Sequence, residues 1–219
     1  MPANKHHPQN DVFKWINGKK QPVTPYNLAG HTPSPTRIDS LHFDGTKLTV
    51  TATNGLGQIQ RLIVPADAGK RQKDGSFDYS STKQQVPNKG PIPEGTYTIN
   101  PQAVQRPSLM DTLIGIAGKN PIKNFGKYPG STAAWGQCRI PITPTPEQER
   151  KTNRSGFTIH GGWKRGSAGC IDITQNDRKF CDFIEKFRGK NQNSVPLTVD
   201  YSKIKGKEKK KETTPSPAK

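Results

Sequence analysis

The chain has 219 residues, which suits one domain of ordinary size with additional segments at its ends. Only 29% of the residues are hydrophobic, and no apolar run is long enough to cross a bilayer, so the sequence predicts no membrane span. The formal net charge of +17 favours polyanionic partners, and three cysteines without a secretory signal do not indicate a disulfide scaffold.

Both ends of the chain are expected to be flexible. Residues 1–35 contain six prolines and few clustered apolar residues, and residues 203–219 contain seven lysines and two glutamates. Such segments do not bury enough surface to offset the entropy of ordering them. The exceptions are five apolar residues that either dock on the core or bind a delivery partner: Phe13, Trp15, Ile16, Tyr26 and Leu28. We therefore expect one folded domain over residues 36–202, a flexible or partly docked segment before it and a disordered tail after it.

Short β-prone runs dominate the central part of the chain. Residues 41–52 alternate around Asp44-Gly45, which is a hairpin turn signal. Further runs lie at residues 59–64, 96–99, 139–142, 157–159 and 195–199. The sequence therefore predicts a mainly β fold.

One or two helices accompany these strands. A weaker helical pattern covers residues 108–117. The clearer one covers residues 175–187, with Thr174 as the expected N-cap. Its apolar residues at helical spacing form a stripe for the core: Phe180, Phe183, Ile184 and Phe187. Because this helix follows Cys170 closely, we expect it to pin the loop that precedes it.

A histidine and a cysteine lie ten residues apart, at His160 and Cys170, in a Gly-rich loop that follows the β-prone run 157–159. A thiol becomes a strong nucleophile when an imidazole takes its proton, because the thiolate is the reactive form. Gly169 before the cysteine leaves backbone N–H groups free for an oxyanion hole. This pair therefore indicates nucleophilic catalysis, although a cysteine in isolation is more often a buried hydrophobe.

A metal site is not expected. Zinc needs three or four ligands, and the sequence contains no CxxC or HxxxH spacing. The other histidines are His6, His7 and His31 in the flexible segment and His42 on an expected strand. We expect neither a metal nor a cofactor.

The motif resembles a known catalytic signature. Ser167-x-Gly169-Cys170-Ile171 with the upstream His160 is similar to the signature of L,D-transpeptidases, the cysteine enzymes that cleave or re-link the peptide stems of bacterial peptidoglycan. The resemblance extends to residues 90–99 (GPIPEGTYTI) and 154–160 (RSGFTIH), and it covers most of residues 36–202.

Two departures refine the resemblance. Housekeeping members carry a second histidine and an arginine where this chain has Ala168 and Asp172, and their gap between base and nucleophile is longer. The shortened pattern is similar to L,D-transpeptidase effectors delivered by type VI secretion systems. Residues 41–50 also resemble the start of that effector domain.

The resemblance implies an L,D-transpeptidase-like β-sandwich or barrel in which Cys170 is the nucleophile and His160 the base. The backbone of Gly161 would orient the imidazole, and Gly169 and Ser167 would support the oxyanion hole and the loop. Candidate substrate-binding residues follow from their chemistry, since guanidinium groups match carboxylates. They are Arg139, Arg154, Trp163 and Arg165, together with Lys164.

The implied activity is acyl transfer on a tetrapeptide stem of peptidoglycan. The acceptor is water, a free D-amino acid or a second stem, which gives L,D-carboxypeptidase, exchange or transpeptidase activity. Because the first ten residues contain no apolar h-region, we expect a protein made in the cytoplasm without a Sec signal that acts as a toxin in the target-cell periplasm. A secretion-apparatus carrier and an immunity protein are the implied partners.

Other functions fit less well. A non-catalytic, basic peptidoglycan-binding module is the main alternative, but a binder needs no thiol and base in one loop. A papain-like peptidase usually places its cysteine before its histidine, and here the order is reversed. The lysine tail is compatible with nucleic-acid binding, yet no helix-turn-helix, zinc-finger or RRM signature accompanies it, so we expect no nucleic-acid partner.

The two remaining cysteines are Cys138 and Cys181. Cys181 falls beside the apolar stripe of the expected helix and is interpreted as buried filler. Cys138 either lies near the site or pairs with Cys181 once the protein reaches an oxidising compartment.

Overall fold

The structure is a computed structural model that describes residues 13–16, 19–22, 35–109, 111–112 and 131–204. The chain divides into two units, residues 1–34 and residues 35–219. In the first unit β1 (Phe13–Ile16) pairs with β2 (Lys19–Pro22) as an antiparallel hairpin. Most of the segments expected to be flexible, and most of the helix expected at residues 108–117, lie outside the described residues.

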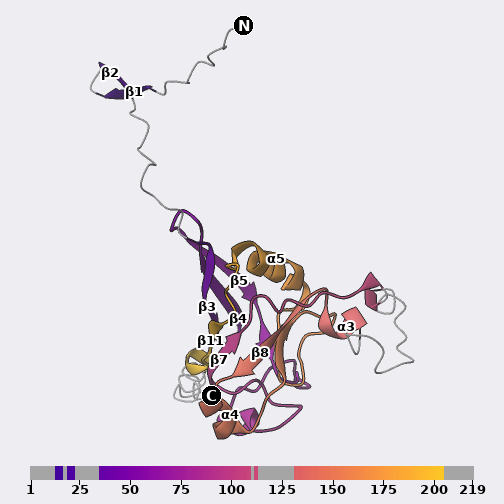
Figure 1. The fold of residues 1–219 in the computed structure, drawn as a ribbon. Coiled ribbons are helices and arrows are strands. Elements are labelled where there is room, and N and C mark those ends of the chain that lie inside the picture. Colours follow the sequence, from indigo (N-terminus) through magenta and orange to yellow (C-terminus); the bar gives the residue numbers. More distant parts are fainter. Residues whose placement is uncertain (1–12, 17–18, 23–34, 110, 113–130, 205–219) are drawn as a thin grey trace, which may run out of the picture. The chain divides into compact units, whose positions relative to one another are not determined.

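A nine-stranded sheet forms the second unit, which confirms the expected mainly β class (Figure 1). Its strand order is β5-β4-β3-β11-β7-β8-β9-β10-β6. The strands are β3 (Arg37–Phe43), β4 (Lys47–Thr53), β5 (Ile59–Pro65), β6 (Asp67–Ala68), β7 (Gly95–Ile99), β8 (Arg139–Pro144), β9 (Phe157–His160), β10 (Ile171–Asp172) and β11 (Val195–Val199). The pairs β3–β11 and β9–β10 are parallel, and the other neighbouring pairs are antiparallel.

The hairpin expected at residues 41–52 is formed by β3 and β4. A carboxylate oxygen of Asp44 accepts hydrogen bonds from the backbone N–H groups of Thr46 and Lys47, and Gly45 has a φ of 85° that only glycine adopts readily. The turn sets Phe43 opposite Leu48, and both side chains are buried in the core. The alternation of hydrophobic residues and the Asp44-Gly45 turn therefore favour the same pairing of β3 with β4.

The helices are more numerous than the one or two expected. They are α1 (Ser81–Gln84), α3 (Ser131–Trp135), α4 (Pro146–Thr152), a 3₁₀ turn (Thr174–Asn176) and α5 (Asp177–Phe187). The expected N-cap at Thr174 is wrong, because Thr174 has a φ of 51° and opens the 3₁₀ turn, so α5 begins at Asp177. No described helix has the length and apolar content to cross a bilayer.

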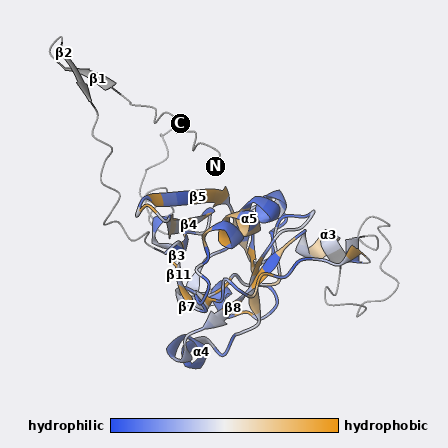
Figure 2. Cartoon of the chain, turned by 45° about the horizontal axis from the view of Figure 1, so that its top comes forward, coloured by the Kyte–Doolittle hydropathy of each residue, from blue (hydrophilic) through white to orange (hydrophobic). Residues whose placement is uncertain are grey.

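The amphipathic helix α5 packs against β3 and β5 (Figure 1). Its hydrophilic and hydrophobic residues lie on different faces (Figure 2). Phe180, Ile184 and Phe187 are buried, as the periodicity predicts. Phe183 packs against the core only in part.

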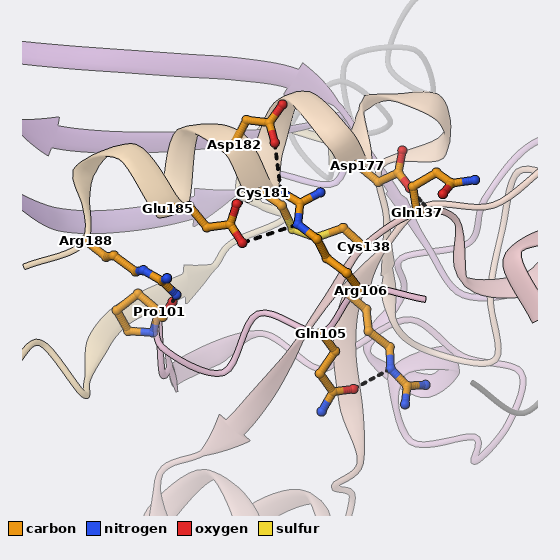
Figure 3. The surroundings of a disulfide bond; sticks show 11 residues. Pro101, Gln105, Arg106, Gln137, Cys138, Asp177, Cys181, Asp182, Glu185 and Arg188 are labelled. Carbon is orange, nitrogen blue, oxygen red and sulfur yellow. Dashed lines mark hydrogen bonds and ion pairs between the residues drawn. A yellow bond between two sulfur atoms is a disulfide. The ribbon is translucent and has the colours of Figure 1, made fainter. Parts of the chain in front are cut away.

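A disulfide joins Cys138, just before β8, to Cys181 on α5 (Figure 3). The interpretation of Cys181 as an unpaired buried side chain is therefore wrong. For Cys138, pairing with Cys181 is one of the two alternatives, and the structure contains that disulfide. The guanidinium of Arg106 adds ion pairs to Asp182 at 2.7 Å and Glu185 at 2.6 Å on the same helix. Together these contacts fix α5 to the entry of β8.

Candidate active site

The sheet brings His160 and Cys170 together at adjacent strand ends. His160 is the last residue of β9, and Cys170 immediately precedes β10. These strands pair in parallel, with Ile171 beside Ile159 and Asp172 beside His160. The loop 161–169 leaves the end of one strand and returns to the start of the other. The pairing of β9 with β10 therefore brings His160 and Cys170, which are ten residues apart in the sequence, into one compact site.

The imidazole of His160 is buried and held on two sides. Its Nδ1 atom lies 2.5 Å from the carbonyl oxygen of Gly161, so Nδ1 carries the proton that this carbonyl accepts. The ring of Trp135 packs edge-on against it at 4.9 Å, and the guanidinium carbon of Arg139 lies 4.9 Å from the centroid of the Trp135 ring. These contacts leave Nε2 for Cys170.

Cys170 is the free cysteine of the chain, and it is buried. Burial alone raises the pKa of its thiol, but the polar groups and charge of His160, with a smaller effect of the neighbouring Thr158, outweigh burial. The pKa of the Cys170 thiol therefore lies below its ordinary value. This is the environment of a thiol prepared to ionise.

Ser167 and Gly169 shape the loop before the thiol. The Ser167 hydroxyl donates to the Cys170 carbonyl oxygen at 2.6 Å and accepts from the Gly169 N–H at 3.2 Å. Gly169 has a φ of 137°, and a Cβ atom there would lie 2.7 Å from Nη2 of Arg154. The Ser167 side chain thus hydrogen-bonds the backbone of the loop itself.

Two buried carboxylates anchor the same loop, a feature that the sequence reasoning missed. Asp172 accepts from the N–H groups of Gly166 and Thr174, both at 2.7 Å. Asp67 on β6, the neighbouring strand, forms a bidentate pair with Arg165 at 2.7 and 2.8 Å. Burial first, and then the charge of Asp67, raises the pKa of Asp172 to about 6.

The candidate substrate-binding cations occupy different surroundings. Arg154 is buried and donates to the backbone carbonyls of Gln84, Gly90 and Pro91, which gives it a structural role under the loop. Arg165 is held by Asp67. Arg139 donates to Gln105 at 2.6 Å and stacks on Trp135. Other protein groups therefore engage all three guanidinium groups, and Arg154 is also near enough to Cys170 for the two to interact electrostatically.

A cavity of about 470 Å³ opens over the histidine and cysteine. Its lining residues are Ala133, Ala134, Trp135, His160, Trp163, Lys164, Gly166, Ser167, Ala168 and Cys170. Trp163 lines it with an indole that is 59% exposed, so among the predicted substrate residues Trp163 and Lys164 reach the cavity. Within the described residues, no group of three or more His, Cys, Asp or Glu side chains is arranged to hold a metal ion.

Sequence reasoning did not single out Trp135 or Thr158. Trp135 comes from α3, which precedes β8, and it reaches His160 only through the tertiary fold. Thr158 lies two residues before His160 on β9, so strand alternation is the signal that places both on one face.

Comparison with known proteins places the chain in a family. The model of the Tlde1 domain matches residues 74–198, which include His160 and Cys170. A search of curated proteins found no match. A solved structure described as "Structure of Bdellovibrio bacteriovorus Bd1075" is 20% identical, with a TM-score of 0.43, and the match covers 83% of this chain and 55% of that chain. That similarity is too low to assign a shared fold.

The Tlde1 match covers more than half of the chain, whereas β3 to β6 lie outside it. Tlde1 effectors are of the L,D-transpeptidase-like kind and act on peptidoglycan. The chain therefore belongs to the Tlde1-domain family of type VI secretion effectors.

Proposed function

We propose that the protein is a cysteine acyl transferase that acts on the tetrapeptide stems of peptidoglycan, with Cys170 as nucleophile and His160 as base. The observation that carries the proposal is that His160 and Cys170 line one open cavity, where His160 acts to lower the pKa of the Cys170 thiol. A binding module gains nothing from such a pair.

The first half-reaction forms a thioester. Nε2 of His160 takes the thiol proton, and the Cys170 sulfur attacks the carbonyl carbon at the L-centre of diaminopimelate. Backbone N–H groups of the loop stabilise the oxyanion. When the intermediate collapses, the C–N bond breaks and His160 returns the proton to the amine of the departing D-alanine. The Gly161 carbonyl stabilises the transient imidazolium through Nδ1.

The second half-reaction releases the acyl group. Water gives a tripeptide, a free D-amino acid gives an exchanged stem, and the amine of a second stem gives a 3-3 cross-link. The walls formed by Trp135 and Trp163 offer apolar surface for the stem, and Lys164 at the cavity offers a cation for a substrate carboxylate. The overall charge of +17 favours retention on the acidic wall polymer.

The family match supports a proposal for delivery. The protein is made in the cytoplasm of the attacking cell, carried by a type VI apparatus and active as an antibacterial toxin in the periplasm of its target, with an immunity protein protecting the producer. Peptidoglycan is substrate and partner, and no cofactor takes part.

The test is mass spectrometry of purified disaccharide-tetrapeptide incubated with the oxidised protein, alone and with D-methionine, beside Cys170→Ala. Loss of D-alanine, or its exchange for D-methionine, that disappears in Cys170→Ala supports the proposal and identifies the acceptor. Unchanged muropeptide with the wild-type protein overturns it. Wall sedimentation that is equal for wild type and Cys170→Ala would then favour the non-catalytic binding module.

A further inference from the structure

Thr158 lies beside the nucleophile because of the strand register. The parallel pairing of β9 and β10 sets Ile171 beside Ile159 and Asp172 beside His160. One step back along both strands, Cys170 comes next to Thr158. Since paired residues on neighbouring strands point to the same face of a sheet, Thr158, His160 and Cys170 share one face. Phe157, Ile159 and Ile171 occupy the opposite, core face.

The hydroxyl of Thr158 is buried and forms no hydrogen bond of good geometry with any described residue. It is the one buried side-chain oxygen or nitrogen of this kind in the described part of the chain. Leaving such a group unpaired costs free energy, so an unpaired buried hydroxyl in a folded protein calls for an explanation. A valine of nearly the same shape would fill the position without that cost.

We propose that Thr158 is a third catalytic residue, whose hydroxyl donates a hydrogen bond to the Cys170 sulfur when the thiol has given its proton to His160. A neutral thiol is a weak acceptor, so the hydroxyl stays poorly paired in the resting protein. A thiolate is a charged acceptor, and hydrogen bonds to charged groups are about twice as strong as neutral ones. The hydroxyl therefore stabilises the ionised form selectively.

Electrostatics at the site agree with this role. Burial opposes ionisation of Cys170, and both the side chain and the backbone of Thr158 act with His160 to lower the pKa of the thiol. The inference rests on the proposed nucleophile Cys170, but it does not depend on the identity of the substrate.

The experiment is the pH dependence of Cys170 alkylation by iodoacetamide in the oxidised full-length protein. Cys170 is the free cysteine, so the adduct reports on it alone. Thr158→Val removes the hydroxyl and keeps the shape, whereas Thr158→Ser keeps the hydroxyl. We expect Thr158→Val to raise the pH midpoint of Cys170 alkylation. At pH values below the midpoints of both proteins, alkylation of Thr158→Val should be about 10-fold slower than that of wild type. Thr158→Ser should stay close to wild type.

Stability separates this role from a structural one. Thr158→Val should unfold at the same temperature as wild type or a higher one, because an unpaired hydroxyl is replaced by a methyl group. If valine does not fit, Thr158→Ala removes the hydroxyl with less bulk and gives the same comparison. A folded Thr158→Val or Thr158→Ala with the wild-type alkylation profile overturns the inference.

The alkylation assay contains no peptidoglycan, so it separates this inference from the proposed function. A shifted midpoint in a protein that leaves muropeptides unchanged would retain Thr158 as a thiolate donor and remove the proposed substrate. If Thr158→Val had the wild-type alkylation midpoint while the wild-type protein cleaved muropeptides in a Cys170-dependent way, the proposed function would stand and the role of Thr158 would be refuted.

Discussion

The carbonyl oxygen of Gly161 accepts a hydrogen bond from Nδ1 of His160 at 2.5 Å, so this carbonyl determines that Nε2 is the ring nitrogen left for the thiol. The backbone of Gly161 packs so closely against the Thr174 carbonyl and the Asp177 carboxyl that a Cβ atom there would overlap both. A side chain at this position must therefore displace the backbone that carries the accepting oxygen.

Gly161→Ala should consequently lose most of its activity. We expect about a 100-fold slower release of D-alanine from disaccharide-tetrapeptide, since a small misplacement of a catalytic group has effects of that size. Gly189→Ala serves as the control, because a Cβ atom there meets the Thr36 oxygen at 3.1 Å and the Gln192 Cβ atom at 3.6 Å without overlap, and lies outside the site. Wild-type release by a folded Gly161→Ala would contradict the role given to the carbonyl.

His160→Ala should raise the pKa of the Cys170 thiol. The hydrogen bond and charge of His160 are what offset burial, so their removal leaves burial dominant and favours the neutral thiol. Alkylation by iodoacetamide at pH 7 should slow about 10-fold or more, with the midpoint moving to higher pH. His42→Ala, on β3, is the matched control. Equal profiles for wild type and His160→Ala would show that the imidazole does not control the thiol.

The proposed nucleophile and base could be found from sequence because Cys170 and His160 flank one short loop that contains several glycines. Most of the longer strands could also be predicted from sequence, because the alternation of apolar and polar residues and the Asp44-Gly45 turn are local signals. By contrast, β6 and β10 have only two residues each and show no periodicity. They exist because the sheet pairs them.

The residues around the pair depend on those long-range pairings. Asp67 lies 98 positions before its partner Arg165 and meets it only because β6 pairs with β10. Trp135 reaches His160 from α3 in the same indirect way. Charge alone favoured Arg154 and Arg165 as substrate ligands, whereas contacts with distant backbone and carboxylate groups engage both of them.

The Cys138–Cys181 disulfide should contribute to stability once the protein is in an oxidising compartment. It closes a chain segment with a sequence separation of 43 and ties β8 to α5, and a disulfide of this kind typically contributes about 3 kcal/mol. Urea unfolding of Cys170→Ala, which removes exchange with the free thiol, should give a lower midpoint with dithiothreitol than without it. Cys138→Ala/Cys170→Ala/Cys181→Ala should unfold at the lower midpoint under both conditions. Equal midpoints for oxidised and reduced Cys170→Ala would contradict the prediction.

Asp172 should make stability fall as the pH rises from about 4 to about 6. Its pKa is raised from 3.8 in the unfolded reference to about 6 in the folded protein, so in this range the folded state binds more protons than the unfolded state. The free energy of unfolding then decreases with increasing pH, and a shift of this size corresponds to about 3 kcal/mol. Asp67 strengthens the effect and Arg165 weakens it.

Asp172→Asn removes this titration and keeps an oxygen that can accept from Gly166 or Thr174. Carboxyl groups far from Asp172 contribute alike in both proteins, so the difference in unfolding free energy between wild type and Asp172→Asn reports on Asp172 and its immediate neighbours. Measured by urea unfolding, that difference should shift in favour of Asp172→Asn as the pH increases from 4 to 7 and then level off. A difference that stays constant over this range would show that Asp172 ionises as readily in the folded protein as in the unfolded chain.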